Sequence, residues 1–374
     1  MIKVLQIITD SNIGGEGRLL INYLHNFDKT KFDMAVVLPL GADLKPLVEA
    51  EGFAVIETEH GRDKSFEVGA VSELCRIFKE FKPDLVHCHS SLSAKIAAYL
   101  CRVPARLYSR HCVFPQPKRL TTFPGKQICG FVNNTLSTHI VAVAKAAMDN
   151  LTEIGVDPKK VTVIINGVEE MERITDEEKA ALRKQLDIGE TDFVCAIPAR
   201  LEIYKGHTYM LGAAALLKDE YPDMKFLIIG GGTIEEDLKR EAEELGISHM
   251  VRFTGFVNRV APYYNIMDLN INCSIGTETS SLSLSEGMSL GVPAVASDFG
   301  GNPYMVTDGW NGFIVPQKDP KALAEAIRRI VGDPALLERL SKGAREAYEK
   351  KFTAAGMTRQ MEELYLRAVE ETKR

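Results

Sequence analysis

The sequence has no long hydrophobic run and no cysteine pattern. No segment of the 374 residues approaches the roughly 18 consecutive apolar residues that span a bilayer. The first residues, MIKVLQIITD, lead into a glycine-containing loop rather than a cleavage site, so they do not resemble a signal peptide. The seven cysteines are scattered singly, without a CxxC pair, which is typical of reduced thiols. We therefore expect a cytoplasmic protein.

Many sequence motifs of metal-dependent and cofactor-dependent enzymes are also missing. The chain contains no DxD, HExxH or Walker loop. The glycines between Asn12 and Gly17 have the wrong spacing for GxGxxG, and the apolar run Met34–Leu38 ends without an acidic residue. These absences disfavour a nicotinamide dehydrogenase and the usual metal clamp on a nucleotide sugar.

Acidic residues are absent from one long tract. The net charge of −6 argues against nucleic acid as a partner, yet residues 85–148 contain eight Lys or Arg and no Asp or Glu, together with Phe114, Phe123 and Phe131. This composition fits an anionic partner, either a phosphorylated acceptor or the headgroups of a membrane. Alternatively, the tract forms a basic face that balances the acidic second half of the chain. The candidate acceptor or membrane contacts are Arg110, Lys118, Arg119 and Lys126.

Short apolar runs alternate with amphipathic stretches along the whole chain. Runs such as Leu85–His89 predict strands, and stretches such as Ser72–Phe81 predict helices between them. Because strands that alternate with helices form parallel sheets, we expect an α/β protein with two Rossmann-like domains and a cleft between them. Ligands bind such sheets at the carboxyl ends of the strands, so the loops there are candidate sites. The expected divisions are 1–168, 169–352 and a terminal helix at 353–374.

Two glutamates, Glu278 and Glu286, bracket the segment ETSSLSLSE. A helix would separate them by about 12 Å along its axis and an extended strand by about 26 Å, outside the roughly 5–9.5 Å spacing of paired carboxylates in glycosidases. A loop that enters a helix near Ser281 would let each carboxylate face a separate point of one extended ligand. The N–H groups of Ser280, Ser281 and Leu282 would then be unpaired donors that suit an anion. The alternative is a serine-capped surface helix.

Other candidate ligand contacts follow predicted strands. Arg200 and Lys205 flank a loop after the strand VCAIPA, where two cations can hold a diphosphate, although both are also common loop residues. Gly14 and Gly15 follow the first strand and would let a phosphate approach the backbone closely.

Three histidines lie at or just past predicted strand ends. His87 and His89 would point to one side of a strand, so metal binding is conceivable, but no third ligand lies at a useful spacing. From the residues alone, His111 is expected to be a structural histidine. We therefore predict no metal site.

Further segments occur in a recognisable order. They are GGEGRLLINYL, KPDLVHCHSSLSA, SRHCVFP, VTVIINGV, ARLEIYKGH, FLIIGGGTIEEDLKREAEELGISHMVRFTGFV and DGWNGFIVP. Together with ETSSLSLSE and the GVPAVAS downstream of it, these segments resemble the retaining glycosyltransferases of family 4, the glycosyl transferases group 1 with the GT-B fold. The resemblance covers the whole chain and implies an acceptor-binding first domain, a nucleotide-sugar-binding second domain and a last helix that returns to the first domain.

The resemblance also assigns roles to single residues. Glu286 would hold the ribose hydroxyls of the donor nucleotide, and Glu278 would face the hydroxyls of the donor sugar. Arg200 and Lys205 would neutralise the leaving diphosphate, and His111 would lie near the reacting sugar carbon. The candidate catalytic residues are therefore His111, Arg200, Lys205 and Glu278. Further donor contacts would be Gly14, Gly15, Gly230, Phe256, Val257, Ser280, Ser281 and Leu282.

The chain departs from the family pattern at two positions. ETSS stands where the family usually has EGFG, and Tyr304 stands where the motif GGxPE has its acid. The serines of ETSS are expected to narrow the freedom of the loop and to alter the choice of sugar. Tyr304 in place of the acid is expected to remove a charge-dependent contact near the sugar.

The activity that the resemblance implies is transfer of a sugar, with retained configuration, from a nucleoside diphosphate to an acceptor hydroxyl. UDP-sugars are the favoured donors, no metal or other cofactor is expected, and the favoured acceptor is a glycan or lipid-linked intermediate of bacterial cell-surface polysaccharide assembly. The enzyme would then work at the inner face of the membrane. The alternatives are a non-hydrolysing nucleotide-sugar epimerase and an inactive sugar-nucleotide-binding subunit.

Overall fold

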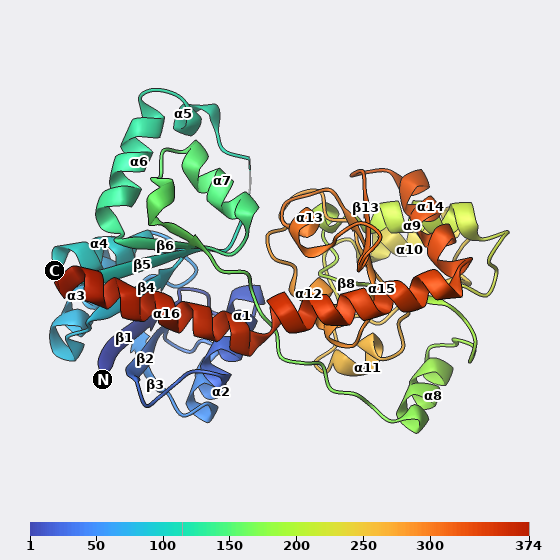
Figure 1. Cartoon of the computed structure of the whole chain (residues 1–374), viewed down its shortest axis with the longest axis horizontal. Coiled ribbons are helices and arrows are strands. Elements are labelled where there is room, and N and C mark those ends of the chain that lie inside the picture. Colours follow the sequence, from blue (N-terminus) through green and yellow to red (C-terminus); the bar gives the residue numbers. More distant parts are fainter. Residues whose placement is uncertain (114, 374) are drawn as a thin grey trace. The chain divides into compact units, whose positions relative to one another are not determined.

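The computed structural model describes residues 1–113 and 115–373, which form two compact α/β units (Figure 1). Unit 1 contains Met1–Gly167 and the described residues from Ala354 on, and unit 2 contains Val168–Thr353. Phe114 and Arg374, which fall within the basic tract and the terminal helix predicted above, lie outside the described residues.

Unit 1 is built on a seven-stranded parallel sheet with the order β3-β2-β1-β4-β5-β6-β7. Its strands are β1 (Ile2–Ile7), β2 (Phe32–Pro39), β3 (Ala54–Thr58), β4 (Leu85–His89), β5 (Ala105–Arg110), β6 (His139–Ala142) and β7 (Val161–Val163). Its helices are α1 (Gly15–His25), α2 (Lys45–Ala50), α3 (Val68–Phe81), α4 (Leu92–Leu100), α5 (Lys118–Thr121), α6 (Gly125–Leu136), α7 (Lys145–Glu153), η1 (Pro158–Lys160) and α16 (Ala354–Lys373).

Unit 2 repeats the plan with a six-stranded parallel sheet in the order β10-β9-β8-β11-β12-β13. Its strands are β8 (Val194–Pro198), β9 (Lys225–Ile229), β10 (Val251–Phe253), β11 (Leu269–Asn272), β12 (Ala294–Ser297) and β13 (Gly312–Val315). Its helices are α8 (Asp176–Gln185), η2 (Ile203–Lys205), α9 (His207–Leu217), α10 (Glu235–Glu244), α11 (Ala261–Tyr264), α12 (Leu282–Ser289), α13 (Asn302–Met305), α14 (Pro320–Val331), α15 (Pro334–Ala347) and the short π-helix η3 (Tyr348–Phe352).

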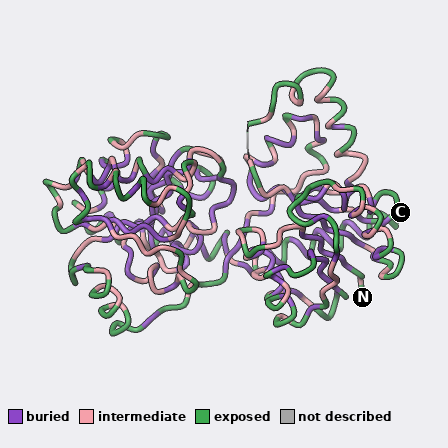
Figure 2. The backbone as a smooth tube through the Cα atoms, turned by 180° about the vertical axis from the view of Figure 1, so that it is seen from behind, coloured by how far each residue is buried: buried purple, intermediate pink, exposed green. Residues whose placement is uncertain are grey.

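The central strands of both sheets are buried along nearly their whole length, as Figure 2 shows in purple. Strands such as β2 (FDMAVVLP) and β9 (KFLII) are apolar without alternation because helices cover both faces of a parallel sheet. The predicted α/β class with two Rossmann-like parallel sheets is therefore confirmed.

The terminal helix α16 forms part of the core of unit 1. It packs against α1 and β5, and its Tyr365 is fully buried with Leu364 and Val369 among side chains of the sheet. None of the helices that the structure describes is long and apolar enough to cross a membrane.

Candidate functional site

The candidate residues of unit 2 gather where the strand order of its sheet reverses. β8 pairs with β9 on one side and with β11 on the other, so the connections after β8 and β11 leave the sheet in opposite directions. Such a reversal opens a crevice at the carboxyl ends of the two strands. The loop after β8 carries Arg200 and Lys205, and the loop after β11 carries Glu278, so the fold brings these two segments together.

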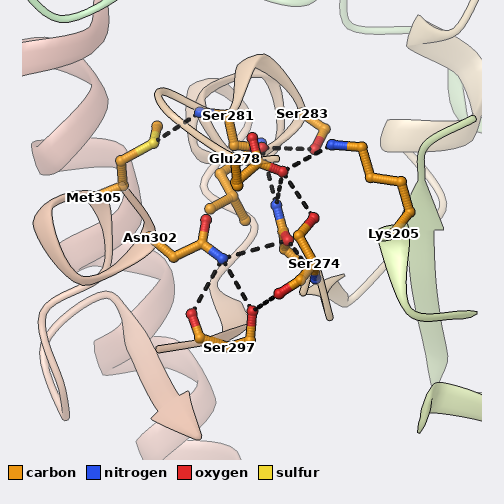
Figure 3. A network of polar contacts seen from close by, with 10 residues as sticks. Lys205, Ser274, Glu278, Ser281, Ser283, Ser297, Asn302 and Met305 are labelled. Carbon is orange, nitrogen blue, oxygen red and sulfur yellow. Dashed lines mark hydrogen bonds and ion pairs between the residues drawn. The ribbon is translucent and has the colours of Figure 1, made fainter. Parts of the chain in front are cut away.

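The carboxylate of Glu278 is held by three donors on one oxygen (Figure 3). Its Oε2 lies 2.9 Å from Lys205 Nζ, 2.9 Å from Ser274 Oγ and 3.2 Å from Asn272 Nδ2. Glu278 is only 8% exposed, and hydrogen bonds and a paired cation offset the cost of burying a carboxylate. Glu278 and Lys205 were predicted from the sequence, but their ion pair and the roles of Asn272 and Ser274 were not.

The side-chain amides of Asn272 and Asn302 link the groups around Glu278 to one another. Asn302, which is fully buried at the start of α13, donates from Nδ2 to the Ser297 carbonyl (3.1 Å) and to Asn272 Oδ1 (3.3 Å). Asn272 also donates to Ser281 Oγ at 3.1 Å. The ends of β11 and β12 and the start of α12 are thereby tied into one polar network (Figure 3), which fixes the orientation of Glu278.

Helix α12 begins where the sequence predicted, directly after Ser281. Ser281 is the N-cap, and its Oγ accepts a hydrogen bond from the Leu284 N–H at 3.5 Å. The expectation that the Ser281 N–H is an unpaired donor is wrong, because it donates to the thioether Sδ of Met305 at 3.1 Å. Ser280 is buried and also interacts with neighbouring groups. The cause is α13, which packs over the helix start, and a sequence reading of α12 alone could not place it there.

Glu286 lies about one turn into α12, as expected, and is 8% exposed. Its Oε2 accepts a 2.6 Å hydrogen bond from the hydroxyl of Tyr264, which comes from α11. Tyr264 lacked any signal in the sequence, since a tyrosine in APYY resembles any helix residue that faces a core.

Two glycines let the segment after β12 lie against the loop of Glu278. A Cβ atom at Gly300 would collide with the Glu278 carbonyl, and one at Gly301 would collide with the Thr279 carbonyl. Gly300 also has φ +59°, in the left-handed region that favours glycine. The GGNP sequence therefore serves the close packing of two backbones at this site, and Tyr304, 48% exposed, lies just beyond it.

The remaining predicted donor contacts of unit 2 lie at the ends of β8 and β9. Arg200 is exposed in the loop after β8. Gly230 follows β9 with φ +135°, and its N–H donates to the Gly255 carbonyl at 3.1 Å. Gly255 is followed by Phe256, which is 76% exposed, and by the half-buried Val257. The exposed phenyl ring offers an apolar surface to a planar ligand group.

In unit 1 the strand order reverses between β1 and β4, and the candidate residues again follow those strands or their neighbour β5. Gly14 is the N-cap of α1, and Gly15 is its first residue. Apart from its chain neighbours and its own helix backbone, no described atom lies within 4 Å of the position that a Cβ of Gly15 would take, so a ligand has room to approach the backbone there.

His111 lies beside two groups from other elements of unit 1. His111 Nε2 is 2.8 Å from His89 Nδ1, and the ligand atoms of Glu16, His89 and His111 all lie within 4.8 Å of one another. The pair considered from the sequence, His87 and His89, does not form this cluster, because the ring nitrogens of His87 contact Tyr365 and Ser109. Sequence spacing could not show this trio, because its members come from α1, β4 and the segment after β5. Two imidazoles and a carboxylate form a donor set that could hold a divalent metal ion.

Burial shifts the titration of these groups. It raises the pKa of Glu16 to about 8, assisted by the negative charge of Asp10 and opposed by a hydrogen bond with Ser90. It lowers the pKa of His111 to about 4. Near neutral pH, Glu16 is therefore largely protonated and His111 is uncharged.

The cations of the acid-free tract differ in their exposure and in their partners. Arg110 is half-buried and donates to the Cys112 carbonyl (3.0 Å) and to Asn150 Oδ1 (3.2 Å). Lys118 and Arg119 are exposed on α5, and Lys126 is half-buried near the start of α6. Lys95, from the same tract, is buried and donates to Asn133 Oδ1.

Comparison with known proteins agrees with this architecture. Residues 178–347 match the model of glycosyl transferases group 1, and residues 13–171 match that of glycosyltransferase family 4. The putative glycosyltransferase EpsD of Bacillus subtilis is 27% identical over 303 residues, 78% of this chain and 79% of its own. A UDP-Gal:alpha-D-GlcNAc-diphosphoundecaprenol alpha-1,3-galactosyltransferase of Escherichia coli is 25% identical over 309 residues, 80% and 79% of the two chains. The crystal structure of Anabaena HepE in complex with UDP matches the fold with a TM-score of 0.83, at 20% identity over 98% and 99% of the chains.

Two parallel-sheet units of this kind define a GT-B protein. The two family models together cover most of both units, so the chain belongs to the family 4 glycosyltransferases, also called glycosyl transferases group 1. The predicted family is therefore confirmed, and neither the epimerase nor the inactive subunit receives support from these similarities.

Proposed function

We propose that the protein transfers a sugar, with retained configuration, from a UDP-sugar to a hydroxyl group of a lipid-linked glycan intermediate. The observation that carries this proposal is the Lys205–Glu278 pair at the strand-order reversal of unit 2. A cation and a carboxylate held side by side at the carboxyl ends of β8 and β11 suit a ligand that carries phosphates at one point and hydroxyls at the next.

The donor would be gripped at separate points of unit 2. Arg200 and Lys205 bind the diphosphate, and Glu278, with one oxygen held by its three donors, presents the carboxylate to the sugar hydroxyls. Glu286, oriented by Tyr264, binds the ribose hydroxyls, while Gly230 and the Phe256–Val257 segment lie toward the base. The choice of UDP rests on relatives, since HepE is described with UDP and UDP-glucose and the E. coli relative is named for UDP-Gal.

In the proposed reaction the bond between the anomeric carbon and the diphosphate oxygen breaks, and a bond to the acceptor oxygen forms on the same face. The leaving phosphate oxygen takes the proton of the acceptor hydroxyl. Arg200 and Lys205 stabilise the charge that develops on the diphosphate, a task that fixed cations can perform without a metal ion. Family resemblance alone adds Gly14 and Gly15 at the phosphates and His111 near the anomeric carbon.

The acceptor proposal has support from α6 in unit 1. Ile128 (59% exposed), Phe131 (72%) and Val132 (37%) recur at helical spacing and form an apolar strip that faces solvent. Phe123, in the turn before α6, is 81% exposed. On the other side of α6, a Cβ atom at Gly130 would collide with the Gly155 carbonyl, so the helix already packs through that side.

Cations flank this apolar strip. Lys118 and Arg119 on α5 are exposed, Lys126 is half-buried, and the acid-free tract supplies no carboxylate to pair with them. An apolar helix face bordered by Lys and Arg is the pattern of an interfacial helix on an anionic membrane. A lipid-linked acceptor lies at such a surface, and the E. coli relative is named for a diphosphoundecaprenol acceptor.

A thermal-shift panel followed by an activity assay tests the donor half of this proposal. UDP and the matching UDP-sugar should raise the melting temperature, because a ligand that binds the native state stabilises it, and ADP and GDP should do so much less. Arg200→Ala and Lys205→Ala should each lower kcat by about 100-fold, whereas Lys239→Ala, an exposed lysine on α10, should not. Turnover within about threefold of wild type in both site variants would contradict the proposed role of these cations.

A further inference from the structure

His111 is the last member of a buried chain of hydrogen bonds in unit 1. Its Nε2 lies 2.8 Å from His89 Nδ1, with the ring centroids 5.1 Å apart and the ring planes 19° from parallel. His89 Nε2 lies 2.7 Å from Gln6 Oε1, and Gln6 Nε2 lies 2.6 Å from the Tyr365 hydroxyl. The chain therefore runs from α16, through β1 and β4, to the segment after β5.

A side branch closes the network at its far end. The Tyr365 hydroxyl lies 2.6 Å from His87 Nδ1, and His87 Nε2 lies 2.7 Å from Ser109 Oγ. Tyr365 is fully buried, and Gln6, His87 and Ser109 are each 1% exposed. Buried polar groups that meet in one network have few alternative partners, so each proton position constrains the next one.

The proton positions follow from the Gln6 amide. Oriented with its NH₂ group toward Tyr365, it offers His89 only its carbonyl oxygen, which can only accept, so His89 Nε2 carries the proton. His89 is only 7% exposed, and its two ring contacts are the uncharged Gln6 amide and the His111 ring, so an uncharged imidazole is favoured there and its Nδ1 is an acceptor. The proton between the two rings then belongs to His111 Nε2. At the branch, Tyr365 accepts from Gln6 and donates to His87 Nδ1.

We propose that His89, Gln6 and Tyr365 are positioning residues that hold His111 as the Nε2–H tautomer, so that Nδ1 is its acceptor nitrogen for a substrate hydroxyl. The consequence is that α16 takes part in setting up His111 through Tyr365. This inference rests on the proposed function, which places His111 near the reacting sugar carbon.

The geometry favours a shared proton over a metal ion between the two rings. Two imidazole nitrogens at 2.0–2.1 Å from a tetrahedral zinc ion would lie about 3.3 Å apart, whereas His89 Nδ1 and His111 Nε2 are 2.8 Å apart. That separation is ordinary for a hydrogen bond between nitrogens.

Nitrogen NMR of the full chain with ¹⁵N-labelled histidine tests the tautomers directly, without any activity. Between pH 6.5 and 7.5, His89 and His111 should each show a protonated Nε2 and an unprotonated Nδ1, assigned with the variants His89→Gln and His111→Gln. Excess EDTA should leave both signals unchanged. A protonated Nδ1 at either histidine, or a shift on adding EDTA, would overturn the inference.

Kinetic measurements on matched variants test whether His89 and Tyr365 position His111 for sugar transfer. His89→Leu removes both hydrogen bonds and should lower kcat by about 10- to 100-fold, with less than a threefold change in KM for the donor. His89→Gln can still donate to Gln6 and accept from His111, so it should keep kcat within about threefold of wild type. Tyr365→Phe should lower kcat by about 3- to 10-fold and give mixed tautomers at His111.

The control is Thr358→Val, which deletes a buried hydroxyl of the same helix that bonds only to the Tyr23 carbonyl among the described groups. It should lower the melting temperature without a change in kcat. Equal kcat in His89→Leu and wild type, or an equal loss in His89→Leu and His89→Gln, would refute positioning by His89. If no sugar is transferred at all, the proposed function fails while the NMR result still decides the tautomers.

Discussion

Lys205 and Glu278, 73 residues apart in the sequence, form an ion pair with Nζ 2.9 Å from Oε2 in a site where neither side chain is more than one-fifth exposed. The pair joins the loop after β8 to the loop after β11. One interaction therefore sets both the position of the cation proposed for the diphosphate and the position of the carboxylate proposed for the sugar.

Variants of this ion pair should show that its contribution to stability differs from its contribution to activity. Glu278→Gln leaves Lys205 without its charge partner and Lys205→Met leaves the carboxylate without its cation, so each should destabilise the protein by about 1–3 kcal/mol. The double variant removes both charges and should regain part of that stability, while activity stays at least about 100-fold below wild type. Melting temperatures and kcat of the three variants measure this. An additive loss of stability in the double variant would show that the pair contributes nothing.

The N-cap at Ser281 should contribute to stability and to activity together. Ser281→Ala removes the cap and the hydrogen bond from Asn272, which should cost about 1 kcal/mol and lower the melting temperature of unit 2 by about 2–4 °C. Asp333→Ala, which removes the N-cap of α15, is the matched control and should destabilise similarly without a change in kcat. Ser281→Thr should behave like wild type. Full activity in Ser281→Ala would separate the cap from the donor site.

His207 should make the protein sensitive to acid. It is 1% exposed, no described group bonds to either ring nitrogen, and burial, followed by the charge of Lys205, lowers its pKa to about 4. The unfolded chain binds a proton near pH 6.5 and the folded chain does not until about pH 4, so stability is lost as the pH falls between these values. For one such group the loss from pH 7 to pH 5 is about 2 kcal/mol.

His207→Leu removes this titration. Urea unfolding at pH 7 and pH 5, followed by a spectroscopic signal, should show a smaller stability loss in the variant than in wild type. Equal losses in both proteins would mean that His207 is protonated in the folded state at pH 5.

The exposed face of α6 should mediate binding to anionic vesicles. Full-length protein should float with vesicles that contain phosphatidylglycerol at low salt and less so at high salt, because charge attraction is screened. Phe131→Asp should reduce flotation at both salt concentrations, and the pair Lys118→Gln and Arg119→Gln should reduce it mainly at low salt. Lys239→Ala is the control. Absence of binding at low salt would contradict the membrane proposal.

Sugar transfer should continue in an excess of EDTA, because Arg200 and Lys205 are proposed to stabilise the negative charge of the leaving diphosphate. Turnover within about twofold of the untreated enzyme is the expected result. A strict requirement for a divalent ion would contradict this scheme, and a higher ion concentration needed for activity in Glu16→Gln would then locate the ion at the cluster of Glu16, His89 and His111.

Much of the fold and part of the site followed from local sequence. Strand β4 has the predicted bounds, Leu85–His89, because a short apolar run of this kind is typical of a buried strand. The helix start after Ser281 was also predictable, since serine caps a helix through bonds to its own neighbours. Family motifs then pointed to Arg200, Lys205, Glu278 and Glu286, and the comparisons confirmed the family.

Only the tertiary structure decided which of these residues share partners. The Lys205–Glu278 pair, the Tyr264 bond to Glu286 and the Met305 contact with the Ser281 N–H all join segments that are distant in sequence. The same holds for the chain from Tyr365 to His111. Capping and apolar periodicity act between near neighbours and can be read from a sequence, whereas these contacts depend on strand order, because adjacency in a parallel sheet is set by the packing of whole strands and helices.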